Sequence, residues 1–195
     1  MKQERTLSIE GKEYTLLISD EPQALLEAKA SGRAVLGCLD TGNGEGASRD
    51  FQGIPYVVPS MEYVTEELLE LILRRYLGLP WLIDETERLY IREFVKEDAE
   101  NIPEEEYGKE EEIFRDPDKL EVYIKNQYGF YEYGTWAVLK KSPSLLIGMA
   151  GVSNPNLPET ALQALPTLPD DLCWLELGYH IFKPYRKNGY ATEAA

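Results

Sequence analysis

Apolar and polar residues in the first part of the chain alternate in two patterns that predict a small unit of strands and helices. Short apolar runs at 14–18, 34–39 and 54–58 have the length and composition of buried strands. Two longer segments, 20–30 and 62–77, repeat apolar residues at the spacing of a helix face. We expect Asp20 to cap the first of these helices. The order strand, helix, strand, strand, helix is typical of an α/β unit with partly parallel strands.

A second series of elements follows in the rest of the chain. The pattern predicts a strand over 89–94, a helix that opens at 96–98 and a second helix over 118–131. Three further strands are expected at residues 135–139, 145–152 and 173–181. Four prolines in 153–171 indicate a long surface insertion before the last of these strands.

Turn-forming residues separate the two series. Gly78 is placed to end the preceding helix in a left-handed conformation, and Pro80 follows it. The boundary is therefore expected between Pro80 and Glu85. The two predicted domains are a small α/β unit over 1–84 and a second α/β unit over 85–195.

Charge and hydropathy narrow the class of partner. The formal net charge of −15 disfavours nucleic-acid backbones and anionic membranes, and it suits a cationic substrate such as an amine. No apolar run approaches the roughly 20 residues of a membrane span. The first residues also lack the apolar core of a signal peptide. We therefore expect a cytoplasmic protein.

Three other features are expected to be structural. Cys38 and Cys173 lie far apart and form neither a metal motif nor a disulfide framework, so both are expected to be reduced. The glycines of 42–46 lack the Lys-Ser/Thr of a phosphate loop and predict a surface turn. The acidic residues between 104 and 112 predict a solvated helix or loop, with a substrate funnel as the alternative.

The most specific chemical signal is the segment 185–194, YRKNGYATEA, which follows the apolar run 175–181. It fits the spacing Arg-x-x-Gly-x-Ala. Glycine lets the backbone approach an anion closely, and the first turn of a helix offers unpaired N–H groups. A strand, a basic glycine loop and a helix start therefore predict a phosphate-binding device. Its candidate residues are Arg186, Lys187, Asn188, Gly189, Tyr190 and Ala191.

These motifs resemble the acyl-CoA signature of the GNAT N-acetyltransferases, and in particular the branch that acetylates the N-termini of ribosomal proteins. Over 85–195 the order of elements matches the first two thirds of that family's mixed sheet with flanking helices. The resemblance implies acetyl transfer from acetyl-CoA to a small-molecule amine or a protein N-terminus. It further implies that the acyl-CoA arm lies along the strand that ends at Ile181 and Phe182. A backbone N–H near 179–181 would then polarise the thioester carbonyl.

Acetyl transfer also needs a base that removes a proton from the amine. Strand alternation places Glu176, Gly178 and His180 on one face. We expect Glu176 to be this base, as an acid on this strand often is in related acetyltransferases; the alternative is a glutamate that orients backbone or meets solvent. His180, the only histidine, is expected to be packed or half-exposed, with a role as general base as the alternative. Three tyrosines are expected either to pack the helix on the sheet or to line an acceptor pocket: Tyr128, Tyr131 and Tyr133.

The resemblance also implies elements beyond Ala195, among them a strand that splays from that of Glu176 and a helix that supplies a tyrosine acid. We therefore expect an incomplete domain: a natural truncation, an artificially shortened chain or a fragment completed by another copy. Weak acetyl-CoA binding and association into a homo-oligomer through bare apolar faces would follow. The alternative function is a non-catalytic module for association or ligand sensing.

Residues 19–37 resemble the tail of the haloacid-dehalogenase-type phosphatases, in which an acid near Asp20 would help to hold magnesium. The nucleophilic aspartate motif of that family has no counterpart here. Asp20 also lacks partner acids at metal-ligand spacing. We therefore expect neither phosphatase activity nor a metal site.

Overall fold

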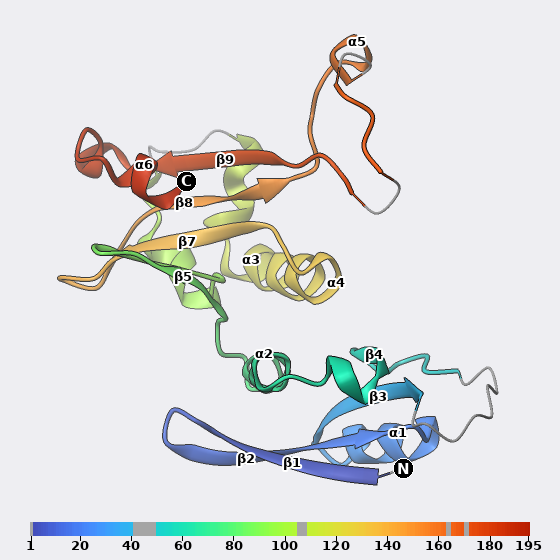
Figure 1. Cartoon of the computed structure of the whole chain (residues 1–195). Coiled ribbons are helices and arrows are strands. Elements are labelled where there is room, and N and C mark those ends of the chain that lie inside the picture. Colours follow the sequence, from blue (N-terminus) through green and yellow to red (C-terminus); the bar gives the residue numbers. More distant parts are fainter. Residues whose placement is uncertain (1, 41–49, 105–108, 163–164, 170–171) are drawn as a thin grey trace. The chain divides into compact units, whose positions relative to one another are not determined.

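The structure, a computed structural model, divides into two compact units, Met1–Trp81 and Leu82–Ala195, each with its own sheet (Figure 1). It describes residues 2–40, 50–104, 109–162, 165–169 and 172–195. The predicted glycine turn at 42–46 and part of the acidic run lie outside these ranges. The predicted α/β class is confirmed. That residues 1–84 and 85–195 fold as independent domains stays a prediction.

The first unit is built on a four-stranded sheet in the order β1-β2-β3-β4. β1 (Lys2–Ile9) and β2 (Lys12–Ser19) form an antiparallel hairpin. β3 (Ala34–Asp40) pairs parallel to β2, and β4 (Val57–Ser60) pairs parallel to β3. The pattern of apolar runs did not reveal β1, because Ile9 is its single buried residue.

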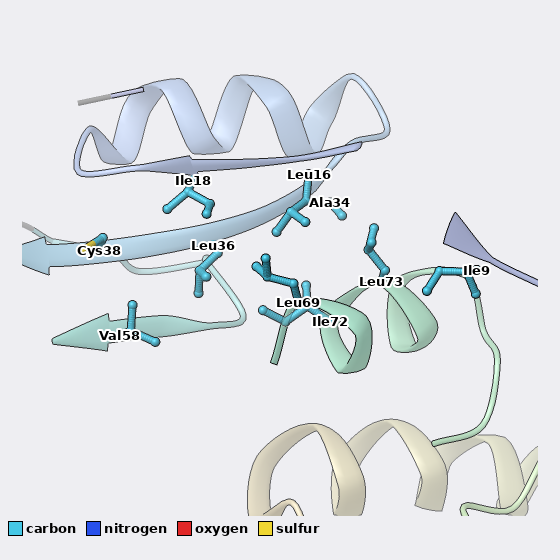
Figure 2. Close-up of a cluster of buried hydrophobic side chains, with 10 residues drawn as sticks. All are labelled: Ile9, Leu16, Ile18, Ala34, Leu36, Cys38, Val58, Leu69, Ile72 and Leu73. Carbon is cyan, nitrogen blue, oxygen red and sulfur yellow. The ribbon is translucent and has the colours of Figure 1, made fainter. Parts of the chain in front are cut away.

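The two long helices of the first unit cover opposite faces of its sheet. α1 (Pro22–Ala30) packs against one face. α2 (Glu66–Tyr76), which follows the short 3-10 helix η1 (Met61–Tyr63) in the chain, packs against the other. As predicted, a left-handed glycine, Gly78, follows α2 with φ 70°. Figure 2 shows the larger core, which contains Ile9, Leu16, Ile18, Ala34, Leu36, Cys38, Val58, Leu69, Ile72 and Leu73.

The cap predicted for α1 is wrong by one residue. Glu21, not Asp20, occupies the N-cap, and its side chain makes no capping hydrogen bond. Pro22 follows at the first helical position, where its fixed φ suits the helix and its missing N–H costs nothing. Asp20 is buried, with 5% of its surface exposed.

The second unit carries a five-stranded sheet in the order β5-β6-β7-β8-β9. Its strands are β5 (Leu82–Glu85), β6 (Leu89–Arg92), β7 (Thr135–Lys140), β8 (Leu145–Ser153) and β9 (Glu176–Ile181). Each neighbouring pair of these described strands is antiparallel, whereas a mixed sheet was expected. Short turns join β5 to β6 and β7 to β8, and such turns permit only antiparallel pairing. The strand β5 was not expected from the sequence, which predicted the first strand of this unit over 89–94.

Helical segments cover one face of the second sheet. They comprise the 3-10 helices η2 (Lys96–Asn101) and η4 (Lys109–Phe114), then α3 (Pro117–Tyr123), the π-helical η5 (Ile124–Tyr128) and α4 (Gly129–Tyr131). The single helix predicted over 118–131 thus contains a π turn. Tyr123 Oη accepts from the Thr135 N–H at 2.8 Å, and Tyr128 Oη donates to the Thr135 carbonyl at 2.5 Å. The π turn lies between these two tyrosines, which are five residues apart in sequence and both bond the backbone of Thr135.

The end of the chain lies on the other face of that sheet. After β9 come the 3-10 helix η6 (Lys183–Tyr185) and α6 (Tyr190–Ala194), and α5 (Glu159–Leu162) lies in the proline-rich insertion. Tyr190 of α6 packs with Ile181 of β9 and with residues of β6, β7 and β8. Phe182 points to the opposite face, into the core beneath η2 and α3.

Candidate functional site

The candidate site is built on the last described strand pair, where β9 forms an edge beside β8 (Figure 1). Ile181 pairs with Gly148, and the Phe182 N–H donates to the Ile147 carbonyl at 2.9 Å. A Cβ at Gly148 would lie 2.4 Å from the His180 carbonyl oxygen. Glycine on β8 therefore allows the end of β9 to lie close against its neighbour.

The chain then folds back onto the end of β9. The Tyr185 N–H donates to the Phe182 carbonyl at 2.8 Å, which closes η6. Arg186 Nε donates to the Ile181 carbonyl at 2.7 Å, and its Nη2 lies 3.3 Å from His180 Nε2. The guanidinium therefore fixes the start of the loop to the end of the strand.

The loop before α6 contains two residues in the left-handed region. Lys187 has φ 63° and Gly189 has φ 80°, and Gly189 is the N-cap of α6. Between them, Asn188 Nδ2 donates to the carbonyls of Tyr185 and Arg186 at 3.0 and 3.1 Å. A left-handed lysine is uncommon and unfavourable, so other contacts must hold the loop in this shape.

A cavity of about 430 Å³ lies between the end of β9 and this loop. Two cations, Arg186 and Lys187, are among its lining residues, and no acid is. The complete lining is Tyr179, His180, Ile181, Tyr185, Arg186, Lys187, Gly189, Tyr190, Ala191 and Thr192. A cavity with two cations and apolar walls suits an anionic group carried on a less polar arm.

Most residues expected from the sequence to bind the cofactor meet at this cavity, but three expected site residues do not line it. Phe182 is buried at 1% exposure in the core on the opposite face. The amide of Asn188 is used within the loop. Glu176 lies at the start of β9, five residues before Ile181, or about 16 Å along an extended strand. Its Oε2 accepts from the Asn156 N–H at 3.2 Å.

The three candidate tyrosines have different surroundings. Tyr128 is 1% exposed; its hydroxyl donates to the Thr135 carbonyl and accepts from the Phe94 N–H at 3.2 Å. Burial raises its pKa. Tyr131 is half exposed, and the Tyr133 hydroxyl lies 3.0 Å from Asn154 Oδ1. Tyr128 is therefore a packing residue.

Contacts of the loop with the turn between β5 and β6 were not expected from the sequence. The Glu193 carboxylate of α6 accepts hydrogen bonds from Thr86 and Arg88, which lie more than 100 positions earlier in the sequence. No local pattern signals such a contact. The Thr86 hydroxyl and then the Arg88 side chain hold the pKa of Glu193 below its ordinary value.

The described part of the chain contains no group of three or more His, Cys, Asp or Glu residues placed to hold a metal ion. Cys38 is buried and Cys173 is exposed, and neither forms a disulfide. Among the helices described, none is long and apolar enough to cross a membrane.

Comparison with known proteins adds two similarities. The model of a family described as an acetyltransferase (GNAT) domain matches residues 88–195. A solved acetyltransferase structure from Agrobacterium tumefaciens str. C58 is similar at 20% identity and a TM-score of 0.34, over 57% of this chain and 61% of that one. The chain thus spans less than two thirds of that structure's length. No curated protein matches.

Proposed function

Because the chain belongs to the GNAT acetyltransferase family, we propose that it transfers an acetyl group from acetyl-CoA to an amine. The observation that carries the proposal is the cavity where the end of β9, the basic loop and the start of α6 meet. All three elements lie inside the matched residues, 88–195.

The lining of the cavity fits the diphosphate of acetyl-CoA, which would supply the activated acetyl thioester. Its cations are Arg186 and Lys187, and the loop's backbone N–H groups are further donors for an anion. We assign diphosphate binding to residues 186–191 and pairing with the pantetheine arm to the backbone at Ile181. Phe182, expected to share that pairing, already uses its N–H on the Ile147 carbonyl and its carbonyl on the Tyr185 N–H.

The two cations have different tasks in this proposal. Arg186 Nε is bonded to the Ile181 carbonyl, so that side chain chiefly ties the loop to the strand. Lys187 is exposed, and its left-handed backbone sets the direction in which its side chain leaves the loop. We therefore assign to Lys187 the main charge that faces the diphosphate.

Glu176 is the proposed base. An amine of pKa about 10 is mostly protonated at neutral pH, and a carboxylate at the start of β9 can take its proton directly or through water. Since Glu176 lies about 16 Å from Ile181 along the strand, the acyl donor would have to reach along β9. The alternative role of Glu176, support of the loop at Asn156, rests on the 3.2 Å hydrogen bond.

The acceptor in this proposal is a small-molecule amine or the N-terminus of a protein, the latter as in the ribosomal-protein branch of the family. A net charge of −15 suits an approaching cation. It disfavours nucleic acid as a direct partner. We place the protein in the cytoplasm and invoke no metal in the reaction.

The test is release of free thiol from acetyl-CoA in the presence of a panel of small amines and of peptides with free N-termini. Lys187→Ala should raise the KM for acetyl-CoA, whereas Lys12→Ala, a matched exposed lysine in the first unit, should not. Glu176→Gln should lower kcat/KM by about 10²-fold or more without a change in Tm, as expected for loss of a general base.

The same assay separates the alternatives. A Glu176→Gln enzyme with the wild-type rate and pH profile would assign Glu176 to support of Asn156 only. Saturable acetyl-CoA binding without turnover on any amine would favour a non-catalytic, ligand-sensing module. Absence of acetyl-CoA binding would contradict the proposed function itself.

A further inference from the structure

Arg88, in the turn between β5 and β6, contacts both the loop and the first turn of α6. Its Nη1 donates to the Asn188 carbonyl at 3.0 Å, and its Nε donates to Glu193 Oε2 at 2.6 Å. Its guanidinium carbon lies 4.5 Å from the centre of the Tyr190 ring. One planar cation thus bonds the loop, pairs with α6 and stacks on an aromatic residue, a combination that suits arginine better than lysine.

Glu193 holds this arginine in place. Its Oε1 accepts from the Thr86 hydroxyl at 2.6 Å and from the Arg88 N–H at 2.9 Å, and its Oε2 pairs with Arg88 Nε and Nη2. The Glu193 side chain is only 18% exposed. A carboxylate with this many donors, largely screened from water, fixes the guanidinium more firmly than a typical surface ion pair does.

The loop needs such support from outside. Lys187 has a left-handed backbone, which is unfavourable for a lysine although Gly189 adopts it freely, and the Asn188 amide donates only within the loop. The Asn188 carbonyl is the acceptor that Arg88 uses. Removal of Arg88 would therefore free the middle of the loop to leave its unfavourable conformation.

We infer that Arg88, fixed by Glu193, is a positioning residue for the diphosphate of the acyl donor. The inference rests on the proposed function. Arg88 does not line the cavity, and its charge is balanced by Glu193, so it acts through the loop. Its loss should weaken the use of donors that carry the diphosphate and spare donors that lack it.

The first arm of the test needs no ligand. Amide hydrogen exchange over 185–194 should accelerate about tenfold in Arg88→Met, because local opening becomes easier when bonds to the loop are lost. Lys96→Met is the matched control. Lys96 is equally exposed, at 42%, and pairs with Asp118 and Glu121 on the opposite face of the sheet. It should leave exchange over 185–194 unchanged.

The second arm compares acetyl-CoA with S-acetylpantetheine, which has the same thioester and arm but lacks the diphosphate and the adenosine 3′-phosphate attached to it. Arg88→Met should raise the KM for acetyl-CoA about tenfold and change kcat/KM with S-acetylpantetheine by less than about twofold. Arg88→Lys keeps a cation near Glu193 and should have the wild-type Tm. Its KM for acetyl-CoA should lie between those of the wild type and Arg88→Met.

Each outcome is decisive. Unchanged exchange over 185–194 in Arg88→Met would overturn the inference whatever the enzyme's activity. Faster exchange with equal impairment of both donors would also overturn it, since Arg88 would then support the whole fold. A wild-type protein that uses neither donor would overturn the proposed function and, with it, the role of Arg88 toward the diphosphate. The exchange data still show, in that case, whether the conformation of the loop depends on Arg88.

Discussion

Gly148→Ala should separate the end of β9 from β8. The added Cβ would lie 2.4 Å from the His180 carbonyl oxygen and 2.9 Å from the Ile181 Cα. Real Cβ contacts essentially never fall below 3.0 Å, so the backbone of β9 must move by at least 0.6 Å (3.0 minus 2.4). Both neighbours are backbone atoms, and no side-chain rotation can relieve the contact.

The cost follows from two effects. Overpacking of this kind costs about 1–3 kcal/mol. Displacement of β9 would also weaken the hydrogen bond from Phe182 N to the Ile147 carbonyl, worth about 1 kcal/mol. A total of about 2–4 kcal/mol should lower the Tm of a unit of this size by roughly 8–16 °C. Tryptophan fluorescence suits the measurement, since Trp136 and Trp174 both lie in the second unit.

Gly178→Ala is the control. Gly178 lies on β9 itself, but a Cβ there would meet no atom within 4 Å. Its Tm should stay within about 2 °C of the wild type, because replacing glycine in a strand carries no steric cost here. Equal Tm values for the two alanine variants would refute the close approach of β9 to β8, and with it the placement of the cavity.

Two further predictions concern stability. Tyr128→Phe should destabilise the second unit by about 1–3 kcal/mol in urea unfolding, because the Phe94 N–H and the Thr135 carbonyl lose a buried partner; a loss no larger than in Tyr131→Phe, at a half-exposed tyrosine, would contradict this. Glu193 has a lowered pKa when folded, owing first to the Thr86 hydroxyl, so its stabilisation is complete above the ordinary value of 4.5 and lost as the pH falls through the folded pKa. The Tm difference between wild type and Glu193→Gln should therefore shrink in acid, and a constant difference between neutral pH and pH about 3 would count against it.

Local patterns revealed most of the fold. The helix predicted over 62–77 ends as expected before Gly78, but it begins at Glu66, because Thr65 caps α2 and Met61–Tyr63 form the 3-10 helix η1. The strands β7 and β8 were evident as apolar runs because most of their central residues are buried. The pattern missed the largely exposed strands β1 and β5, whose polar composition gives no apolar run, whereas the equally exposed β9 was predicted from its apolar residues.

In the candidate site, too, local sequence predicted some features, whereas contacts between distant segments were missed. The loop of 186–191 was recognisable because glycine and basic residues cluster within a few positions. The contacts of Arg88 with Asn188 and Glu193 join segments at least 100 residues apart, so no sequence pattern near Arg88 predicts them. The π turn at Ile124–Tyr128 was likewise hidden, because it accompanies two tyrosines that both reach Thr135, a residue beyond the helix.

Binding of the acyl donor at this cavity is tested by an amide NMR titration of the 195-residue chain with acetyl-CoA. It locates binding at any affinity. Saturable shifts concentrated on residues 179–192 are expected, with much smaller shifts when S-acetylpantetheine replaces acetyl-CoA. Shifts confined to other residues, or none at millimolar acetyl-CoA, would contradict the claim that the cavity between β9 and its loop binds the acyl donor.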